Sequence, residues 1–239
     1  MVRGTLVAGR ITLIILSAIG SAAFAAGAGT VAHLSGSLSV KHPDGAVRIL
    51  SRNSEVNPGD VLTTEKDSYA QINFSDGSSL TLRPNTSVKV EGYHFVKDQP
   101  QEDSSFLRLV KGGMRTVTGL IGRRGNHDAY KFGTNQATIG IRGSSGDTLE
   151  CSQGCPDVTP TSGKLPPGMY HATHTGSYIV QNDAGSQTVG PGQFSFVKDA
   201  NTPPTLGDKD PGLGLSQLPF ALPGVPTAPG APGAECIVR

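Results

Sequence analysis

The sequence contains no tryptophan and few other aromatic residues. Of its 239 residues, 8 are phenylalanine and 5 are tyrosine, so aromatic side chains make up 5% of the chain. Aromatic rings bury more apolar area per residue than other side chains do. We therefore expect a thin core that consists mainly of valine, isoleucine, leucine and phenylalanine.

The chain also lacks an excess of charge of either sign. It has 20 basic and 19 acidic side chains, which gives a formal net charge of +1. Loss of an N-terminal leader would remove two of the basic residues and none of the acidic ones, leaving a net charge of −1. Proteins that bind nucleic acid concentrate positive charge on one face. The pair Arg123-Arg124 is too short to form such a patch, so we expect no nucleic acid partner.

Long hydrophobic runs are absent after the first 25 residues. Two arginines precede the apolar run Ile11–Ile19, and small residues then lead to a cleavage site between Ala25 and Ala26. This order is typical of a signal peptide. We expect residues 1–25 to be removed and the mature protein to be periplasmic or secreted. The alternative is an uncleaved membrane anchor, although the run is shorter than the roughly 20 residues of a spanning helix. Membrane contact is expected only in that case.

Cysteine is scarce, with three residues in the whole chain. Export places them in an oxidising compartment. The spacing of Cys151 and Cys155 predicts a local disulfide, which would stiffen a turn more than it stabilises the domain. A metal site would need two further ligands nearby, and none stands at a suitable spacing. We expect Cys236 to be a free thiol, with an intermolecular disulfide as the alternative.

Short alternating strands dominate what is present. In the stretch Ala70–Gly77, Ile72 and Phe74 fall on one face while Gln71 and Asn73 fall on the other. The stretch ends in an Asp-Gly pair, which favours a hairpin turn, and the alternation then resumes. We also expect a turn at Lys111–Gly113 between two strands, and irregular structure from Ser144 to Gly168. No window has the pattern of a long amphipathic helix. The sequence predicts an all-β fold, a short-stranded meander, β-sandwich or solenoid-like body.

Composition divides the chain into four parts. We predict a signal peptide at 1–25, a β-domain at 26–143, a cysteine loop with a further β-unit packed on the first at 144–200, and a disordered proline- and glycine-rich tail at 201–239. The residues from 36 to 62 resemble those from 176 to 197, which indicates two similar β-units.

Several polar residues are candidate functional groups. Asp60 and Asp76 stand beside turn glycines, and we expect their carboxylates to hold the turns through local backbone hydrogen bonds. Arg142 could pair with an acid at the end of a sheet or contact a partner. His171 and His174 are three residues apart, so in a strand they point to opposite faces and cannot share one metal ion.

The remaining groups favour no catalytic reading. We expect His127-Asp128, like His171 and His174, to be no metal site. The pair Ser144-Ser145 lacks the sequence of a nucleophile elbow. We expect no catalytic, cofactor or metal site, and hence no enzyme.

The chain resembles the FecR domain family. The stretches that carry the resemblance are Gly29–Val31, Gly36–Val40, Pro58–Thr64, Ala70–Thr86, Leu107–Arg115 and Thr134–Gly143. They follow one another in the order expected for that family. Two departures are Ser144, where the family's closing Arg-Gly-Thr motif has threonine, and the Cys151–Cys155 loop, where the family continues as a smooth strand.

The resemblance implies an exported β-rich domain without catalytic activity. The best-known members of the family pass signals from outer-membrane receptors through a membrane helix to a cytoplasmic regulator of a sigma factor. We expect no such cytoplasmic part before the β-region of this chain. The expected function is a module that binds an envelope or extracellular protein, and the alternative is a membrane-anchored signalling regulator with an uncleaved N-terminal segment. Strand edges, the predicted loop Lys97–Ser105 and the Cys151–Cys155 loop are the expected binding surfaces.

Overall fold

The computed structural model describes residues 27–126, 128–152, 155 and 165–207. These residues form fifteen strands, and none of them belongs to a helix that could cross a membrane. The predicted cleavage site at Ala25 and Ala26, the thiol of Cys236 and most of the predicted tail lie outside the described residues.

The strand bounds are β1 (Gly29–Ser35), β2 (Leu38–Lys41), β3 (Val47–Leu50), β4 (Glu55–Val56), β5 (Val61–Thr64), β6 (Tyr69–Phe74), β7 (Ser79–Leu82), β8 (Ser87–His94), β9 (Ser104–Val117), β10 (Tyr130–Gly133), β11 (Thr138–Glu150), β12 (Met169–Asn182), β13 (Gly185–Val189), β14 (Phe194–Val197) and β15 (Thr205–Gly207).

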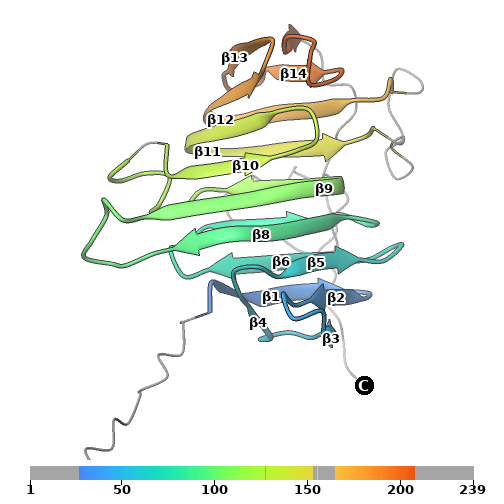
Figure 1. The fold of residues 1–239 in the computed structure, drawn as a ribbon, viewed down its shortest axis with the longest axis vertical. Coiled ribbons are helices and arrows are strands. Elements are labelled where there is room, and N and C mark those ends of the chain that lie inside the picture. Colours follow the sequence, from blue (N-terminus) through green and yellow to red (C-terminus); the bar gives the residue numbers. More distant parts are fainter. Residues whose placement is uncertain (1–26, 127, 153–154, 156–164, 208–239) are drawn as a thin grey trace, which may run out of the picture.

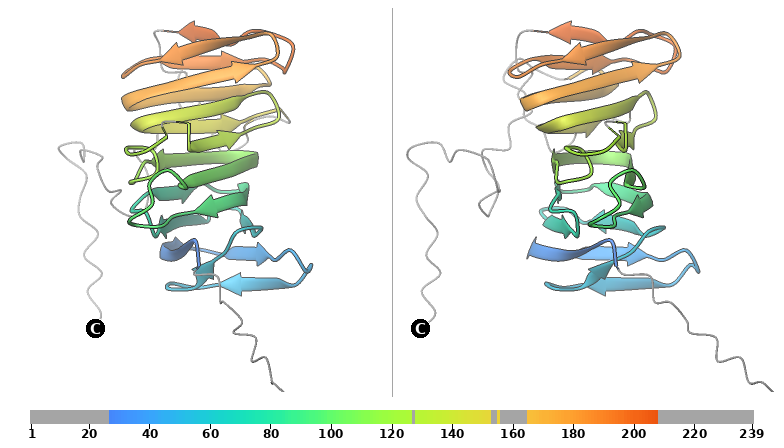
Figure 2. Two further views of the ribbon diagram at one scale, coloured as in Figure 1. Left: turned by 60° about the vertical axis from the view of Figure 1, so that its left-hand side comes forward. Right: turned by 90° about the vertical axis from the view of Figure 1, so that its left-hand side faces the viewer.

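The strands belong to one hydrogen-bonded sheet that is folded into two layers (Figures 1 and 2). Layer 1 runs in the order β3, β2, β5, β8, the first part of β9, β10, the first part of β11, the second part of β12, and β13. Layer 2 runs in the order β4, β1, β6, β7, the second part of β9, the second part of β11, the first part of β12, β14 and β15. The fold is therefore an all-β sandwich whose layers share three long strands.

Each long strand passes from one layer to the other at a glycine. β9 bends at Gly112, β11 at Gly143 and β12 at Gly176, with φ angles of 84°, 59° and 68°. At Gly112 a Cβ atom would lie 2.6 Å from the Cα of Thr86, in the connection between β7 and β8. A positive φ and that close approach both require glycine at this position.

The bends lie at opposite edges in the two halves of the molecule. In layer 2, Ser145 lies opposite Val117 and Glu150 lies opposite Gly112. The bend of β11 is therefore at the far end of the sheet from the bend of β9. The bend moves to the other end because β10 runs parallel to the first part of β9 in layer 1. Strand β11 then runs antiparallel to β10 and leaves layer 1 at the opposite end.

One hydrophobic core fills the space between the layers. Its members from layer 1 include Leu38, Leu62, Val88, Leu107, Phe132, Ile139 and Val180, and its members from layer 2 include Val31, Ile72, Leu80, Leu82 and Met114. Tyr130 and Tyr178 are fully buried in it. The expected aliphatic core is present, and two tyrosines rather than phenylalanine alone supply its largest rings.

Three local predictions were wrong. The sequence predicted two strands with a turn at Lys111–Gly113, but β9 is continuous there because Gly112 bends the chain without reversing it. It predicted irregular structure from Ser144, but β11 continues to Glu150. Residues 205–207, which the composition assigned to the tail, form β15 and pair with β14.

Two predicted boundaries differ from the ends of the strands. The predicted domain boundary at residue 143 falls inside β11, so the residues on both sides share one sheet; the division itself remains a prediction. The loop predicted at Lys97–Ser105 ends earlier, since β9 begins at Ser104.

The bend at Gly112 should be sensitive to a single methyl group. We expect Gly112→Ala to lower the free energy of unfolding by about 3 kcal/mol, because alanine must adopt a left-handed conformation against Thr86. Gly140→Ala is the matched control in β11, where no atom lies within 4 Å of the added Cβ, and it should change stability by less than about 1 kcal/mol. Urea denaturation measures both, and equal effects would contradict the assigned bend.

Candidate functional site

Asp60 is fully buried and holds the turn before β5. Its Oδ2 accepts a hydrogen bond from the backbone N–H of Asn57 at 2.8 Å, and its Oδ1 lies 2.6 Å from Nδ1 of His42. The local bond is the one expected from the sequence. The contact with His42 also ties this turn to the hairpin that joins β2 and β3.

Asp76 holds the turn between β6 and β7. Its Oδ1 accepts hydrogen bonds from the backbone N–H and the hydroxyl of Ser78, at 3.0 and 2.6 Å, and from the hydroxyl of Tyr93 at 3.2 Å. Its Oδ2 accepts from the backbone N–H of Ile121 at 3.2 Å. This buried carboxylate therefore fixes both its own turn and the segment that follows β9.

His171 and His174 point to opposite faces of β12. His171 is fully buried in the core, where its Nδ1 lies 2.9 Å from the hydroxyl of Thr148 and its ring lies 4.2 Å from that of Tyr178. The side chain of His174 is 40% exposed on the outer face of layer 2. Among the described residues, no group of three or more His, Cys, Asp or Glu side chains could hold a metal ion.

His174 belongs to a cluster that crosses three strands. Arg115 on β9 forms a bidentate ion pair with Asp147 on β11, with N–O distances of 2.7 and 2.9 Å. His174 on β12 approaches Asp147 at 2.8 Å and Arg115 at 3.1 Å. The side chains of Arg115 and Asp147 are 6% and 5% exposed. Sequence reasoning missed this cluster.

The pKa values in this region follow from burial and pairing. Burial raises the pKa of Asp147, but hydrogen bonds from Arg115 and His174 outweigh it and hold the pKa below its ordinary value. Burial lowers the pKa of His171 from 6.5 to about 3, although the charge of Asp147 opposes that shift. Asp147 is therefore charged and His171 neutral at physiological pH, which suits a structural role for both.

The serine pair forms no catalytic arrangement with the described residues. The hydroxyl of Ser144 donates to the backbone carbonyl of Ser177 at 3.2 Å, and that of Ser145 lies 2.9 Å from the hydroxyl of Thr175. Both contacts join β11 to β12 beside their bends. His127 lies outside the described residues.

Cys151 and Cys155 form a disulfide, with their Cα atoms 4.9 Å apart. Cys151 packs with Leu149, Leu165 and Tyr170 in a second, smaller apolar cluster, separate from the main core. The disulfide therefore anchors the start of the loop between β11 and β12 on the sheet.

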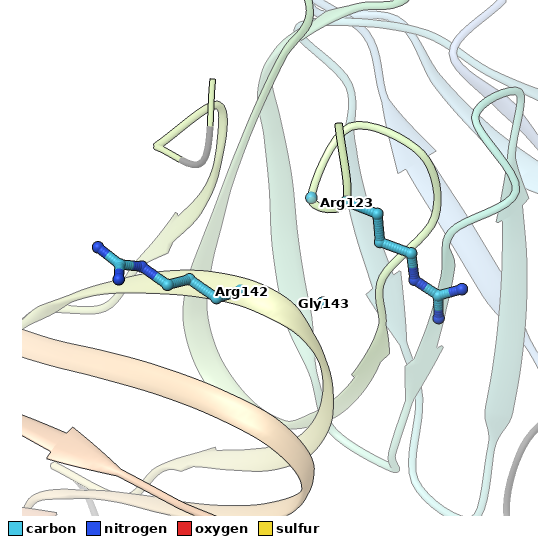
Figure 3. A pocket seen from close by; sticks show the side chains of 4 residues that line it. Arg123, Arg142 and Gly143 are labelled. Atoms are coloured by element: carbon cyan, nitrogen blue, oxygen red, sulfur yellow. The ribbon is translucent and has the colours of Figure 1, made fainter. Parts of the chain in front are cut away.

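Arg123 and Arg142 line a surface pocket of about 390 Å³ together with Gly122 and Gly143. Figure 3 shows their guanidinium groups pointing away from one another. Neither arginine has an acid within ion-pair distance in the described part of the chain. The structure therefore does not show the acid pairing considered for Arg142 among the described residues. Because the two guanidinium groups diverge, they do not bind one anion together.

The free edge of layer 1 is the strongest candidate for a binding site. Strand β3 pairs with β2 on one side and with no described strand on the other, and it lies at one end of the molecule (Figure 1). Val47 and Ile49 on this strand are 66% and 74% exposed. Natural proteins normally protect exposed apolar edge strands, because such edges pair readily with other chains.

Part of the chain is similar to a known protein family. Residues 60–163 match the model of the family described as FecR protein, which confirms that this part of the chain is FecR-like. The match includes the disulfide loop, whereas the similar stretches from Gly29 to Gly59 lie outside it. No curated protein matches the sequence.

The solved structures that resemble the fold are distant. Two crystal structures of a "putative anti-sigma factor" from Parabacteroides distasonis each share 15% sequence identity at a TM-score of 0.45, and the match covers 63% of this chain and 60% of theirs. A structure described as a "Cell surface anchoring domain" shares 24% identity at a TM-score of 0.26, over 26% of this chain and 83% of its own. The chain thus spans about 60% of the length of the first two proteins.

The neutral state of His171 predicts a specific pH dependence of stability. The pKa of this group is about 3 in the folded protein and about 6.5 when unfolded, so below pH 6.5 the unfolded state takes up a proton that the folded state does not. His171 should therefore reduce the unfolding free energy by up to about 1.4 kcal/mol per pH unit as the pH falls from 6.5 toward 3.

Urea denaturation of His171→Gln between pH 7 and pH 4 measures this contribution. We expect a flatter profile than that of the unmodified protein, and an unchanged profile for the control His94→Gln, because the side chain of His94 is exposed. Identical slopes for the unmodified protein and His171→Gln would show that the histidine titrates normally.

Proposed function

We propose that this protein is a non-catalytic, exported binding module of the FecR type that docks another protein along the edge of β3. The observation that carries the proposal is the exposure of Val47 and Ile49 on an ordered strand with a free edge. An incoming extended segment can add to such an edge through main-chain hydrogen bonds. By contrast, the buried carboxylates of Asp60 and Asp76 accept hydrogen bonds that hold turns.

The periplasm or the cell exterior is the proposed location. The signal-like sequence before Ala26 supports it, and so does the Cys151–Cys155 disulfide, since disulfides persist in oxidising compartments. The partner is accordingly an envelope or extracellular protein.

A membrane-anchored regulator of transmembrane signalling is the second proposal. The FecR match favours it, because the resemblance implies signalling across a membrane. The two proposals differ at the segment Ile11–Ile19, which is removed in the first and retained as an anchor in the second. Both leave the edge of β3 available for a partner.

Site-specific photo-crosslinking in cells tests the docking edge. A photoreactive amino acid at Ile49 should give one discrete crosslinked species, whereas the same group at Thr188, exposed on β13 at the other end of the sandwich, should not. The partner is then purified, and Val47→Lys should weaken its binding at least tenfold. Equal crosslinking from both positions, or unchanged binding by Val47→Lys, would contradict the proposal.

N-terminal sequencing of the same purified protein separates export from anchoring. We expect a soluble periplasmic or secreted protein that begins at Ala26. A membrane-bound protein that retains Ile11–Ile19 would instead select the anchored regulator.

A further inference from the structure

We infer that the edge of β3 selects an antiparallel partner strand in which an acidic residue stands between two apolar ones. This inference rests on the proposed function and adds the chemistry of the partner. It follows from where the main chain and the side chains of Val47, Arg48 and Ile49 point.

The hydrogen-bond pattern of the hairpin fixes the direction of the main-chain groups. The N–H of His42 donates to the carbonyl of Ala46 at 2.9 Å, and bonded pairs alternate along an antiparallel ladder. The next bonded pair is therefore Val40 with Arg48. The N–H and C=O groups of Val47 and Ile49 consequently point away from β2, toward the free edge.

The pairing of β2 with β5 supports the same alternation. The N–H of Glu65 donates to the carbonyl of Ser37 at 3.3 Å, in register with the pairs Ser39–Thr63 and Lys41–Val61. Ser39 and Lys41 thus direct their main-chain groups toward β5. Those of Val40 are left for β3.

The side chains of the edge alternate in the same way. Val47 and Ile49 lie opposite Lys41 and Ser39, on the outer face of layer 1, whereas Arg48 lies opposite Val40, which faces the core. A strand that bonds to Val47 and Ile49 would place two of its own side chains beside theirs, and apolar residues fit these two positions best. Its residue opposite Arg48 would form a non-hydrogen-bonded pair, in which side chains lie closest together.

The charge at this edge is positive and unpaired. Neither Arg48 nor Lys41 has an acid within ion-pair distance in the described part of the chain. A carboxylate opposite Arg48 would therefore add a favourable cross-strand pair, and a cation there would be repelled.

A second copy of this chain fits the edge poorly. The two-fold antiparallel register that uses Val47 and Ile49 of both copies places Arg48 opposite Arg48. The same arginine would thus discourage self-association while favouring an acidic partner.

Synthetic peptides test the inference on the mature full-length protein. Two octapeptides, identical except for a central Val-Glu-Val or Val-Lys-Val, are titrated while the backbone amide signals are followed by NMR. We expect the Val-Glu-Val peptide to bind about tenfold more tightly, with the largest shifts at Val47 and Ile49. Arg48→Glu, a change at an exposed position, should reverse the order of the two peptides.

Three outcomes would overturn the inference. These are equal affinities for the two peptides, an order that Arg48→Glu does not reverse, and a dimer of the unmodified protein that Ile49→Lys dissociates. If crosslinking from Ile49 succeeds and the peptide order does not reverse, the proposed docking at β3 is supported and the preference for an acidic partner residue is refuted. If crosslinking from Ile49 fails while the peptides behave as expected, the edge has the stated preference and the proposed function fails.

Discussion

The structure depends on continuous hydrogen bonding through left-handed bends. Three long strands change layers at Gly112, Gly143 and Gly176 without leaving the sheet, so the two layers share one hydrogen-bond network as well as one core. A side chain at Gly112 would meet Thr86 in the connection between β7 and β8, and a side chain at Gly176 would meet Ser144 on β11.

This arrangement separates architecture from recognition. Buried carboxylates hold turns, and the ion pair of Arg115 and Asp147 joins adjacent strands of layer 2. A buried pair of this kind adds little net stability, because desolvation offsets much of the attraction. At the edge of β3, exposed apolar side chains coincide with main-chain groups that point away from β2. We therefore propose that recognition by this FecR-like chain takes place at that edge.

The sequence was informative wherever the determining interactions are local. The alternation of Ile72 and Phe74 predicted the all-β class, the turn aspartates behaved as their spacing predicted, and the three-residue spacing of His171 and His174 placed them on opposite faces. The glycine bend of β9 was mistaken for a turn, because a left-handed glycine serves equally in a reversal and in a bend. The neighbouring strands decide between the two.

Long-range features could not be predicted for a related reason. Arg115, Asp147 and His174 are brought together by strand pairing, and no local pattern links them. The free edge of β3 has the same origin, since an edge is defined by the strand that is missing beside it. The resemblance between residues 36–62 and 176–197 shows the limit of local patterns. Gly36, before β2, and Gly176, inside β12, both adopt positive φ where the chain enters layer 1. The stretches nevertheless diverge, because β5 lies in layer 1 and β14 in layer 2.

The central claim is that Val47 and Ile49 present unpaired main-chain groups at an ordered edge. Residue-resolved amide hydrogen exchange of the free protein measures this directly. The account predicts fast exchange at Val47 and Ile49, and protection at Arg48 and Leu50, whose amides face β2. Equal protection at all four amides would show that the edge is already occupied, and would contradict the account.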